Sequence, residues 1–197
     1  MNARTLPRFT LESYLAWEEK QPVRNEFYRG EIFAMVGARR VHGTVVGNLV
    51  REFGNQLKGS PCRAFHEGMK VQIGDDTVLY PDVFVTCDKA DLVTEHIFKA
   101  PSVVVEVLSP STQGYDRSWK FAQYRRIETL QDFLMIDPDT WRVEGYRRTA
   151  DGEWMLVDMN DAQVLDLPAI GLRVRFADVF DGIGPPADPS KPPAEAD

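Results

Sequence analysis

Cysteine and histidine are scarce in this chain, and their scarcity excludes the common zinc sites and a disulfide framework. The 197 residues include two cysteines, Cys62 and Cys87, and three histidines. The cysteines form no CxxC pair, and the histidines show neither HExxH nor mixed Cys/His spacing. We therefore predict two reduced, half-buried thiols and no zinc centre.

The absence of other motifs excludes further classes of enzyme and a membrane-spanning segment. There is no GxxxxGK[ST] phosphate loop, no GxGxxG and no GxSxG elbow. No apolar run approaches the roughly 20 residues that span a bilayer, and residues 1–20 lack a signal-peptide core. These features predict a cytoplasmic protein without a membrane segment. The net charge of −7 argues against a generally basic nucleic-acid binder, although a local basic patch is compatible with it.

What is present predicts one α/β domain. Apolar spacing indicates helices over 11–20, after a Thr10 cap, and over 41–58. Residues 27–33 read as a hairpin around Gly30, and 116–127 as a basic helix. Residues 182–197 contain five prolines and predict a disordered tail, which leaves 1–181 as a single domain. Strands are expected over 63–66, 69–73, 78–85, 102–108, 132–136, 141–147, 153–157 and 172–174.

A glutamate stands where an apolar residue is expected. Glu106 interrupts the β-branched run 103–108, which should form a central strand buried on both faces. A carboxylate there is costly unless it is paired, protonated or bound to a metal. The preceding strand carries Asp82, and if the two strands pair, the two carboxylates converge. Two such groups without soft ligands suit Mg²⁺ or Mn²⁺.

Each acid also has a plainer interpretation. Asp82 could be a strand-end hydrogen-bond acceptor, since a second Pro-Asp pair, Pro138-Asp139, reads as a turn. Glu106 could form a structural ion pair with Lys120 or an arginine. The presence of both acids on neighbouring strands, with a basic helix behind them, favours a metal site.

The basic helix supplies the third component of this site. Lys120 follows the loop that leaves the Glu106 strand, and its ammonium could reach the same place. There it would hold an attacking water or stabilise charge on a phosphate. Tyr124 lies one turn later on the same helix face. Arg125 and Arg126 are equally compatible with a solvated helix face.

These residues resemble the Uma2 family, bacterial restriction-endonuclease-like proteins of the PD-(D/E)xK superfamily. The resemblance covers about residues 11–147, and Leu108 stands where a strict (D/E)xK motif has lysine. In that family the lysine is thought to lie on the next helix, as Lys120 does. The segments that carry the resemblance are 80–83 (YPDV), 105–112 (VEVLSPST), 116–124 with Lys120 and Tyr124, 26–31 (EFYRGE), His42 and 133–138 (FLMIDP).

The resemblance implies a restriction endonuclease-like fold, a mixed β-sheet flanked by helices, and metal-dependent cleavage of phosphodiesters. It implies Asp82 and Glu106 as metal ligands, Lys120 as the basic residue and Glu26 as an accessory acid. We add the carbonyl of Val107 as a further ligand of Mg²⁺ or Mn²⁺. Contacts to DNA, the expected substrate, should fall near this site, on Arg39, Arg40, Arg51, Arg117, Arg125 and Arg126.

Two other functions stay open at this point. A catalytically inactive module could use the same fold to bind nucleic acid or a protein partner, which the low basicity favours. A metal-dependent hydrolase could instead act on a smaller phosphorylated substrate. A symmetric homodimer would suit an enzyme that cleaves two strands.

Overall fold

The computed structural model describes residues 8–35, 37–110 and 116–186. Of Asp116 and Arg117 only the backbone is described, so the expected contact of Arg117 with DNA lies outside the described side chains. Residues 111–115 of the family-like segment and 187–197 of the predicted tail lie outside the described residues altogether.

The N-terminal elements follow local sequence signals closely. Helix α1 (Leu11–Glu18) begins with a capping box, in which Thr10 and Ser13 each accept a hydrogen bond from the other's main-chain N–H. Strands β1 (Asn25–Tyr28) and β2 (Glu31–Ala34) form the expected hairpin. Its two turn residues, Arg29 and Gly30, have φ of 47° and 89°, the left-handed pair that a tight hairpin requires.

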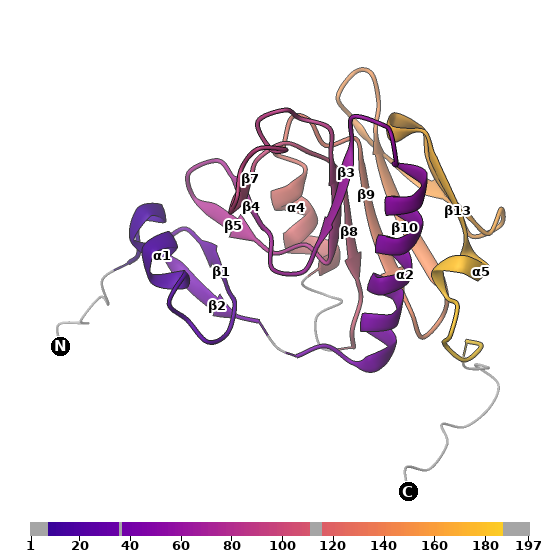
Figure 1. Ribbon diagram of the computed structural model, residues 1–197, viewed down its shortest axis with the longest axis horizontal. Coiled ribbons are helices and arrows are strands. Elements are labelled where there is room, and N and C mark those ends of the chain that lie inside the picture. The colour runs from indigo at the N-terminus through magenta and orange to yellow at the C-terminus, as the bar shows by residue number, and fades with distance from the viewer. Residues whose placement is uncertain (1–7, 36, 111–115, 187–197) are drawn as a thin grey trace, which may run out of the picture.

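The strands form two main sheets and one small hairpin (Figure 1). The five-stranded sheet has the order β2-β1-β5-β4-β7, and the six-stranded sheet the order β11-β10-β9-β8-β6-β3. In the larger sheet β8 and β9 run parallel and the other pairs run antiparallel, so the sheet is mixed. The bounds are β3 (Arg63–His66), β4 (Lys70–Ile73), β5 (Thr77–Leu79), β6 (Val83–Thr86), β7 (Ile97–Phe98), β8 (Pro101–Val107), β9 (Asp132–Asp137), β10 (Arg142–Arg148), β11 (Trp154–Asp158), and the paired β12 (Val164–Leu167) and β13 (Leu172–Arg175).

The prediction of one strand over 78–85 is wrong. This segment forms two strands, β5 and β6, which belong to different sheets. Pro81 lies between them, and proline has no N–H to give to a central ladder. The chain therefore leaves one sheet at Tyr80 and enters the other at Val83, which places Asp82 at the crossing between the sheets.

Helices cover the two faces of the larger sheet. Helix α2 (Arg40–Gln56) packs on the face formed by Val103, Val105 and Val107 of β8. The π-helix η1 (Asp116–Lys120) and helix α4 (Phe121–Tyr124) lie on the opposite face, where Tyr124 and Val104 share a second apolar cluster. Strand β8 is therefore central and buried on both faces, as the sequence predicts. The remaining helices are the 3-10 turn η2 (Pro168–Ile170) and α5 (Phe176–Val179).

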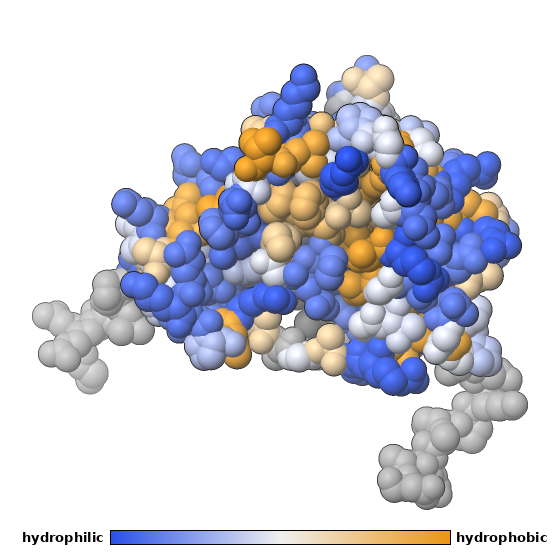
Figure 2. Space-filling view, in the orientation of Figure 1, coloured by the Kyte–Doolittle hydropathy of each residue, from blue (hydrophilic) through white to orange (hydrophobic). Residues whose placement is uncertain are grey.

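In Figure 1, α1 and the β1–β2 hairpin lie at the left of the molecule, while β13 and α5 lie at the right beside α2. Polar side chains cover most of the face seen in Figure 2, with apolar residues gathered in smaller groups. Within the described part of the chain, no helix combines the length and apolarity that crossing a bilayer requires.

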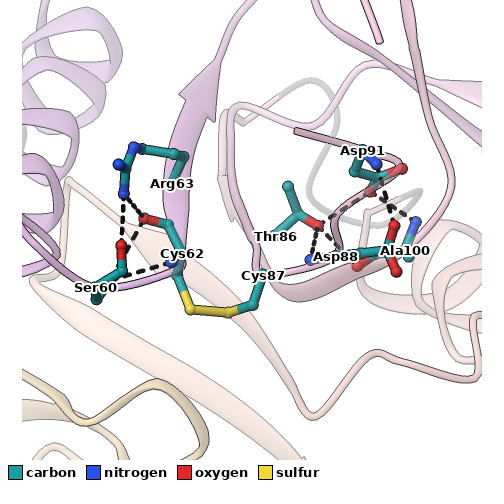
Figure 3. The surroundings of a disulfide bond; sticks show 8 residues. All are labelled: Ser60, Cys62, Arg63, Thr86, Cys87, Asp88, Asp91 and Ala100. Carbon is teal, nitrogen blue, oxygen red and sulfur yellow. Dashed lines mark hydrogen bonds between the residues drawn. A yellow bond between two sulfur atoms is a disulfide. The ribbon is translucent and has the colours of Figure 1, made fainter. Parts of the chain in front are cut away.

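The prediction of two reduced cysteines is also wrong, because Cys62 and Cys87 form a disulfide (Figure 3). Cys62 directly precedes β3 and Cys87 directly follows β6. These strands pair antiparallel with Arg63 opposite Thr86, so the cysteines face each other with Cα atoms 4.0 Å apart. Strand register, which cysteine spacing does not reveal, decides this pairing.

Removing this disulfide should lower stability measurably. In the chain-entropy account, a bond that closes a loop of 25 residues restricts the unfolded chain and contributes about 3 kcal/mol. We expect Cys62→Ala/Cys87→Ala to lower the free energy of unfolding by about that amount in urea titrations. The parent protein in reductant should then match the double variant, and equal stability with and without reductant would contradict the prediction.

Candidate functional site

The central feature of the site is that Asp82 and Glu106 occupy facing positions at the end of the antiparallel β6–β8 pair. Val83 pairs with Val105 in the β6–β8 register, so the next positions outward are Asp82 and Glu106. The main-chain N–H of Val107 donates to Asp82 Oδ2 at 2.7 Å. This bond fixes the Asp82 carboxylate against the end of β8, beside the strand that carries Glu106.

Glu106 is held by two donors from the helical segment above the sheet. It is 3% exposed, and its carboxylate lies 3.1 and 3.2 Å from Lys120 Nζ. The Tyr124 hydroxyl donates to Glu106 Oε1 at 2.8 Å. Burial and the neighbouring Glu106 raise the pKa of Tyr124 well above its ordinary value, so the phenol stays protonated and remains a donor. The structural ion pair considered for Glu106 is therefore present.

A third carboxylate reaches this cluster from the other sheet. Glu26 of β1 lies 3.3 Å from Lys120 Nζ and is 5% exposed. Its Oε1 also accepts a weak hydrogen bond from the Tyr80 N–H, at 3.4 Å. Lys120 therefore pairs with both Glu26 and Glu106, while Asp82 lies beside Glu106 at the end of the β6–β8 ladder.

A buried polar network fixes the strand that carries Glu26. Glu18, at the end of α1, accepts hydrogen bonds from the Asn25 N–H at 2.8 Å and from the Tyr80 hydroxyl at 2.9 Å. The Tyr14 hydroxyl donates to the Asn25 carbonyl. Burial raises the pKa of both tyrosines, which keeps them as donors. This network, which sequence reasoning missed, attaches α1 to β1 and to the segment before Asp82.

His42 is a further site residue to which the sequence analysis gave no role. It lies in the first turn of α2, is 9% exposed, and its Nε2 is 3.1 Å from Asp82 Oδ2. A carboxylate can only accept here, so the bond requires the proton on Nε2. The family resemblance had marked His42 as opening this helix, and a polar residue on the helix's buried face was the available signal.

The carboxylates of this cluster suit a hydrated divalent cation better than one held by protein ligands alone. Among residues 8–35, 37–110 and 116–186, no three His, Cys, Asp or Glu side chains are grouped as a ready-made metal site. Asp82 and Glu106 supply carboxylate oxygens; both oxygens of Glu106 already accept hydrogen bonds, and Asp82 accepts through Oδ2. Mg²⁺ typically uses one or two carboxylates and keeps several waters, so this pair fits its chemistry.

The expected DNA-contacting arginines are not gathered into one described cluster. Arg39 forms an ion pair with Asp139 at 2.6 Å, whereas Arg40 is exposed at the start of α2 and Arg125 is exposed after α4. Two others serve intramolecular pairs: Arg51 with Glu52 at 3.1 Å and Arg126 with Asp76 at 2.7 Å. Their contacts with nucleic acid stay predictions.

Comparisons with known proteins point to one family. Residues 11–177 match the model of the Uma2 family, whose description is "Putative restriction endonuclease". The uncharacterized protein slr1290 of Synechocystis sp. is 35% identical over 90% of this chain and 94% of its own length. The uncharacterized protein sll1609 of the same organism is 32% identical over 81% of this chain and 92% of its own.

A solved structure supports the fold. The crystal structure of a protein from Anabaena variabilis, described as a putative nuclease belonging to DUF820, superposes with a TM-score of 0.71 at 23% identity. The similarity covers 87% of this chain and 97% of that protein. At this identity the likeness concerns the fold, and it confirms the expected mixed α+β, restriction endonuclease-like architecture.

Proposed function

Because the chain belongs to the Uma2 family, described as putative restriction endonucleases, we propose that it is a metal-dependent endonuclease that hydrolyses phosphodiester bonds in DNA. The observation that carries the proposal is the convergence of Asp82, Glu106 and Lys120 at the end of the β6–β8 ladder. Paired carboxylates beside an ammonium combine a cation site with a group that neutralises phosphate charge.

Asp82 and Glu106 are the residues that would hold Mg²⁺ or Mn²⁺, with the Val107 carbonyl as a further proposed ligand. A cation bound there would act as a Lewis acid towards the phosphate and make water a stronger nucleophile. The hydrogen bond that Val107 makes to Asp82 uses its N–H, so it leaves the carbonyl available for this role.

The chain's own side chains set up the reaction around that cation. Lys120 would orient the attacking water and offset the negative charge that builds on the phosphate. Glu26 holds the Lys120 ammonium from the side of β1, which is its proposed accessory role. Tyr124 keeps the Glu106 carboxylate in one orientation through its 2.8 Å hydrogen bond. Arg39, Arg40, Arg117 and Arg125 are the proposed contacts to the nucleic-acid backbone.

A cleavage assay tests this function directly. Supercoiled plasmid, single-stranded DNA and RNA should be incubated with the parent protein in Mg²⁺, Mn²⁺ or EDTA, alongside Asp82→Ala. We expect plasmid cutting that requires the divalent ion and is lost in the variant. Cleavage of RNA alone would identify RNA, and not DNA, as the substrate. Cleavage that EDTA does not inhibit would refute a metal-dependent nuclease.

One observation favours a second function, a catalytically inactive module that binds nucleic acid or a protein partner. Lys120 already neutralises Glu106 through a buried ion pair, which is complete without any cation. Nucleic-acid binding that persists in EDTA, without cleavage by the folded parent in either ion, would support this function over the nuclease.

His42 is expected to act on the cation through Asp82, as a positioning residue. Its hydrogen bond holds Oδ2, so that Oδ1 would be the oxygen offered to a cation. Loss of such a partner typically weakens metal affinity 10- to 100-fold. We therefore expect His42→Ala to raise the Kd for Mn²⁺ by about that factor.

Calorimetric titration of Mn²⁺ into the folded proteins measures this without reference to activity. His42→Gln, whose amide N–H can replace the Nε2–H donor, should recover much of the affinity. The exposed His96 provides the matched control, His96→Ala. Equal Mn²⁺ affinity in the parent and His42→Ala would rule out the positioning role.

A further inference from the structure

Strand β11 forms an edge of the six-stranded sheet and is unusually unprotected. Among the described residues it pairs with β10 alone. Natural edge strands commonly contain a lysine, a proline or a bulge that prevents pairing, because an unprotected edge can form hydrogen bonds with a strand of another chain. The β11 sequence, WMLVD, has no lysine or proline, and its pairing with β10 continues without a bulge. Met155 and Leu156 are 53% and 63% exposed.

Two hydrogen bonds establish which main-chain groups of β11 face the open edge. The Arg148 N–H donates to the Gln131 carbonyl at 2.8 Å, so it points towards β9 and away from β11. One residue later, the Thr149 N–H donates to the Glu153 carbonyl at 2.8 Å, so it points towards the β11 side. Alternation along an antiparallel pair extends this pattern down the whole strand.

It follows that Met155 and Val157 exchange hydrogen bonds with β10, whereas Trp154, Leu156 and Asp158 face away from it. The N–H and C=O groups of these last three residues have no hydrogen-bond partner within the described structure. The free edge therefore offers regularly spaced donors and acceptors at every second residue.

This edge is complementary to a copy of itself. If two β11 strands align antiparallel about Leu156, each outward-facing group meets another: Leu156 faces Leu156, and Trp154 faces Asp158. On the opposite face of the sheet, Met155 then meets Val157, an apolar pair. A register shift by one residue would set outward-facing groups against inward-facing ones, so the backbone excludes odd shifts. Among the remaining registers, the alignment about Leu156 is the one that pairs all three outward-facing residues of each copy.

We propose that the protein forms a symmetric dimer through β11, in which the two six-stranded sheets join into one continuous sheet about Leu156. The occupant of the edge is a second copy of this chain, since both the hydrogen-bonding register and the exposed apolar side chains are self-complementary. The proposal is independent of the proposed nuclease activity, because none of the site residues lies on β11.

Sedimentation velocity of the parent protein tests the dimer, with an expected mass twice the 22.4 kDa of one chain. Leu156→Pro should return the mass to that of one chain, since it removes an outward N–H on the axis and leaves the ladder to β10 intact. Leu156→Lys should do the same by placing like charges face to face. The control is Val93→Lys, at an apolar position that is 82% exposed in another part of the chain.

Cross-linking tests the register separately. Residues that face each other in a hydrogen-bonded antiparallel pair have Cα atoms about 5.5 Å apart, within reach of a disulfide. Oxidised Leu156→Cys should therefore run as a covalent dimer, and Val93→Cys should not. A parent protein that stays monomeric at every concentration would overturn the proposal. So would a dimer that Leu156→Lys leaves intact, or one in which Leu156→Cys fails to cross-link.

Discussion

Glu106→Gln is expected to lower metal-dependent cleavage by more than about 100-fold while the protein stays folded. Changes to partners of metal ligands typically cost 10- to 100-fold, so loss of a ligand's charge should exceed that range. Glutamine keeps the volume of the side chain and can still accept the hydrogen bond from Tyr124. The substitution therefore separates the charge of Glu106 from its packing in β8.

The measurement pairs plasmid cleavage rates with Mn²⁺ titration and thermal unfolding of the same samples. Glu95→Gln, at an exposed glutamate in the segment before β7, is the matched control and should cleave at the parent rate. If Glu106→Gln cut DNA as fast as the parent, the assignment of Glu106 as a ligand would be wrong. Loss of cleavage with unchanged Mn²⁺ affinity would give Glu106 a role other than metal binding.

Lys120→Met is expected to lower the free energy of unfolding by about 3–5 kcal/mol in EDTA. Lys120 is 7% exposed, and its ammonium lies within 3.3 Å of both Glu26 and Glu106. Methionine has a similar length and no charge, so the two carboxylates would remain buried without their cation. Breaking one side of a buried ion pair costs more than the pair itself contributes.

Urea unfolding in EDTA and in excess Mg²⁺ distinguishes stabilisation by the Lys120 ammonium from stabilisation by a bound metal ion. If the carboxylates bind the ion, Mg²⁺ should restore part of the lost stability, because a ligand of the folded state stabilises it. Lys99→Met, at an exposed lysine, should change stability little in either buffer. Unchanged stability of Lys120→Met in EDTA would show that the carboxylates do not need the ammonium.

Several features of this protein follow from the sequence alone. The capped α1, the tight hairpin around Gly30 and the β-branched strand β8 appear in the structure where local patterns predict them. The anomaly of Glu106 in an apolar strand was likewise visible as a pattern. Each of these depends on residues within a few positions of one another, because propensity, capping and side-chain alternation are short-range properties.

Other features were decided by tertiary structure. Pro81 divides one apolar run between two sheets, and strand register sets Asp82 opposite Glu106. Register also joins Cys62 to Cys87, which the sequence analysis had left reduced. Glu26, which lies 94 residues before Lys120 in the chain, contacts it from a different sheet.

The physical reason is that these pairings connect residues distant in sequence. Which strands become neighbours, and in which register, depends on the simultaneous burial of apolar faces on both sides of β8. The sequence by itself therefore determined the elements and the chemical oddity of a buried glutamate. The packing of the two sheets against their helices decided which acids, base and cysteines meet.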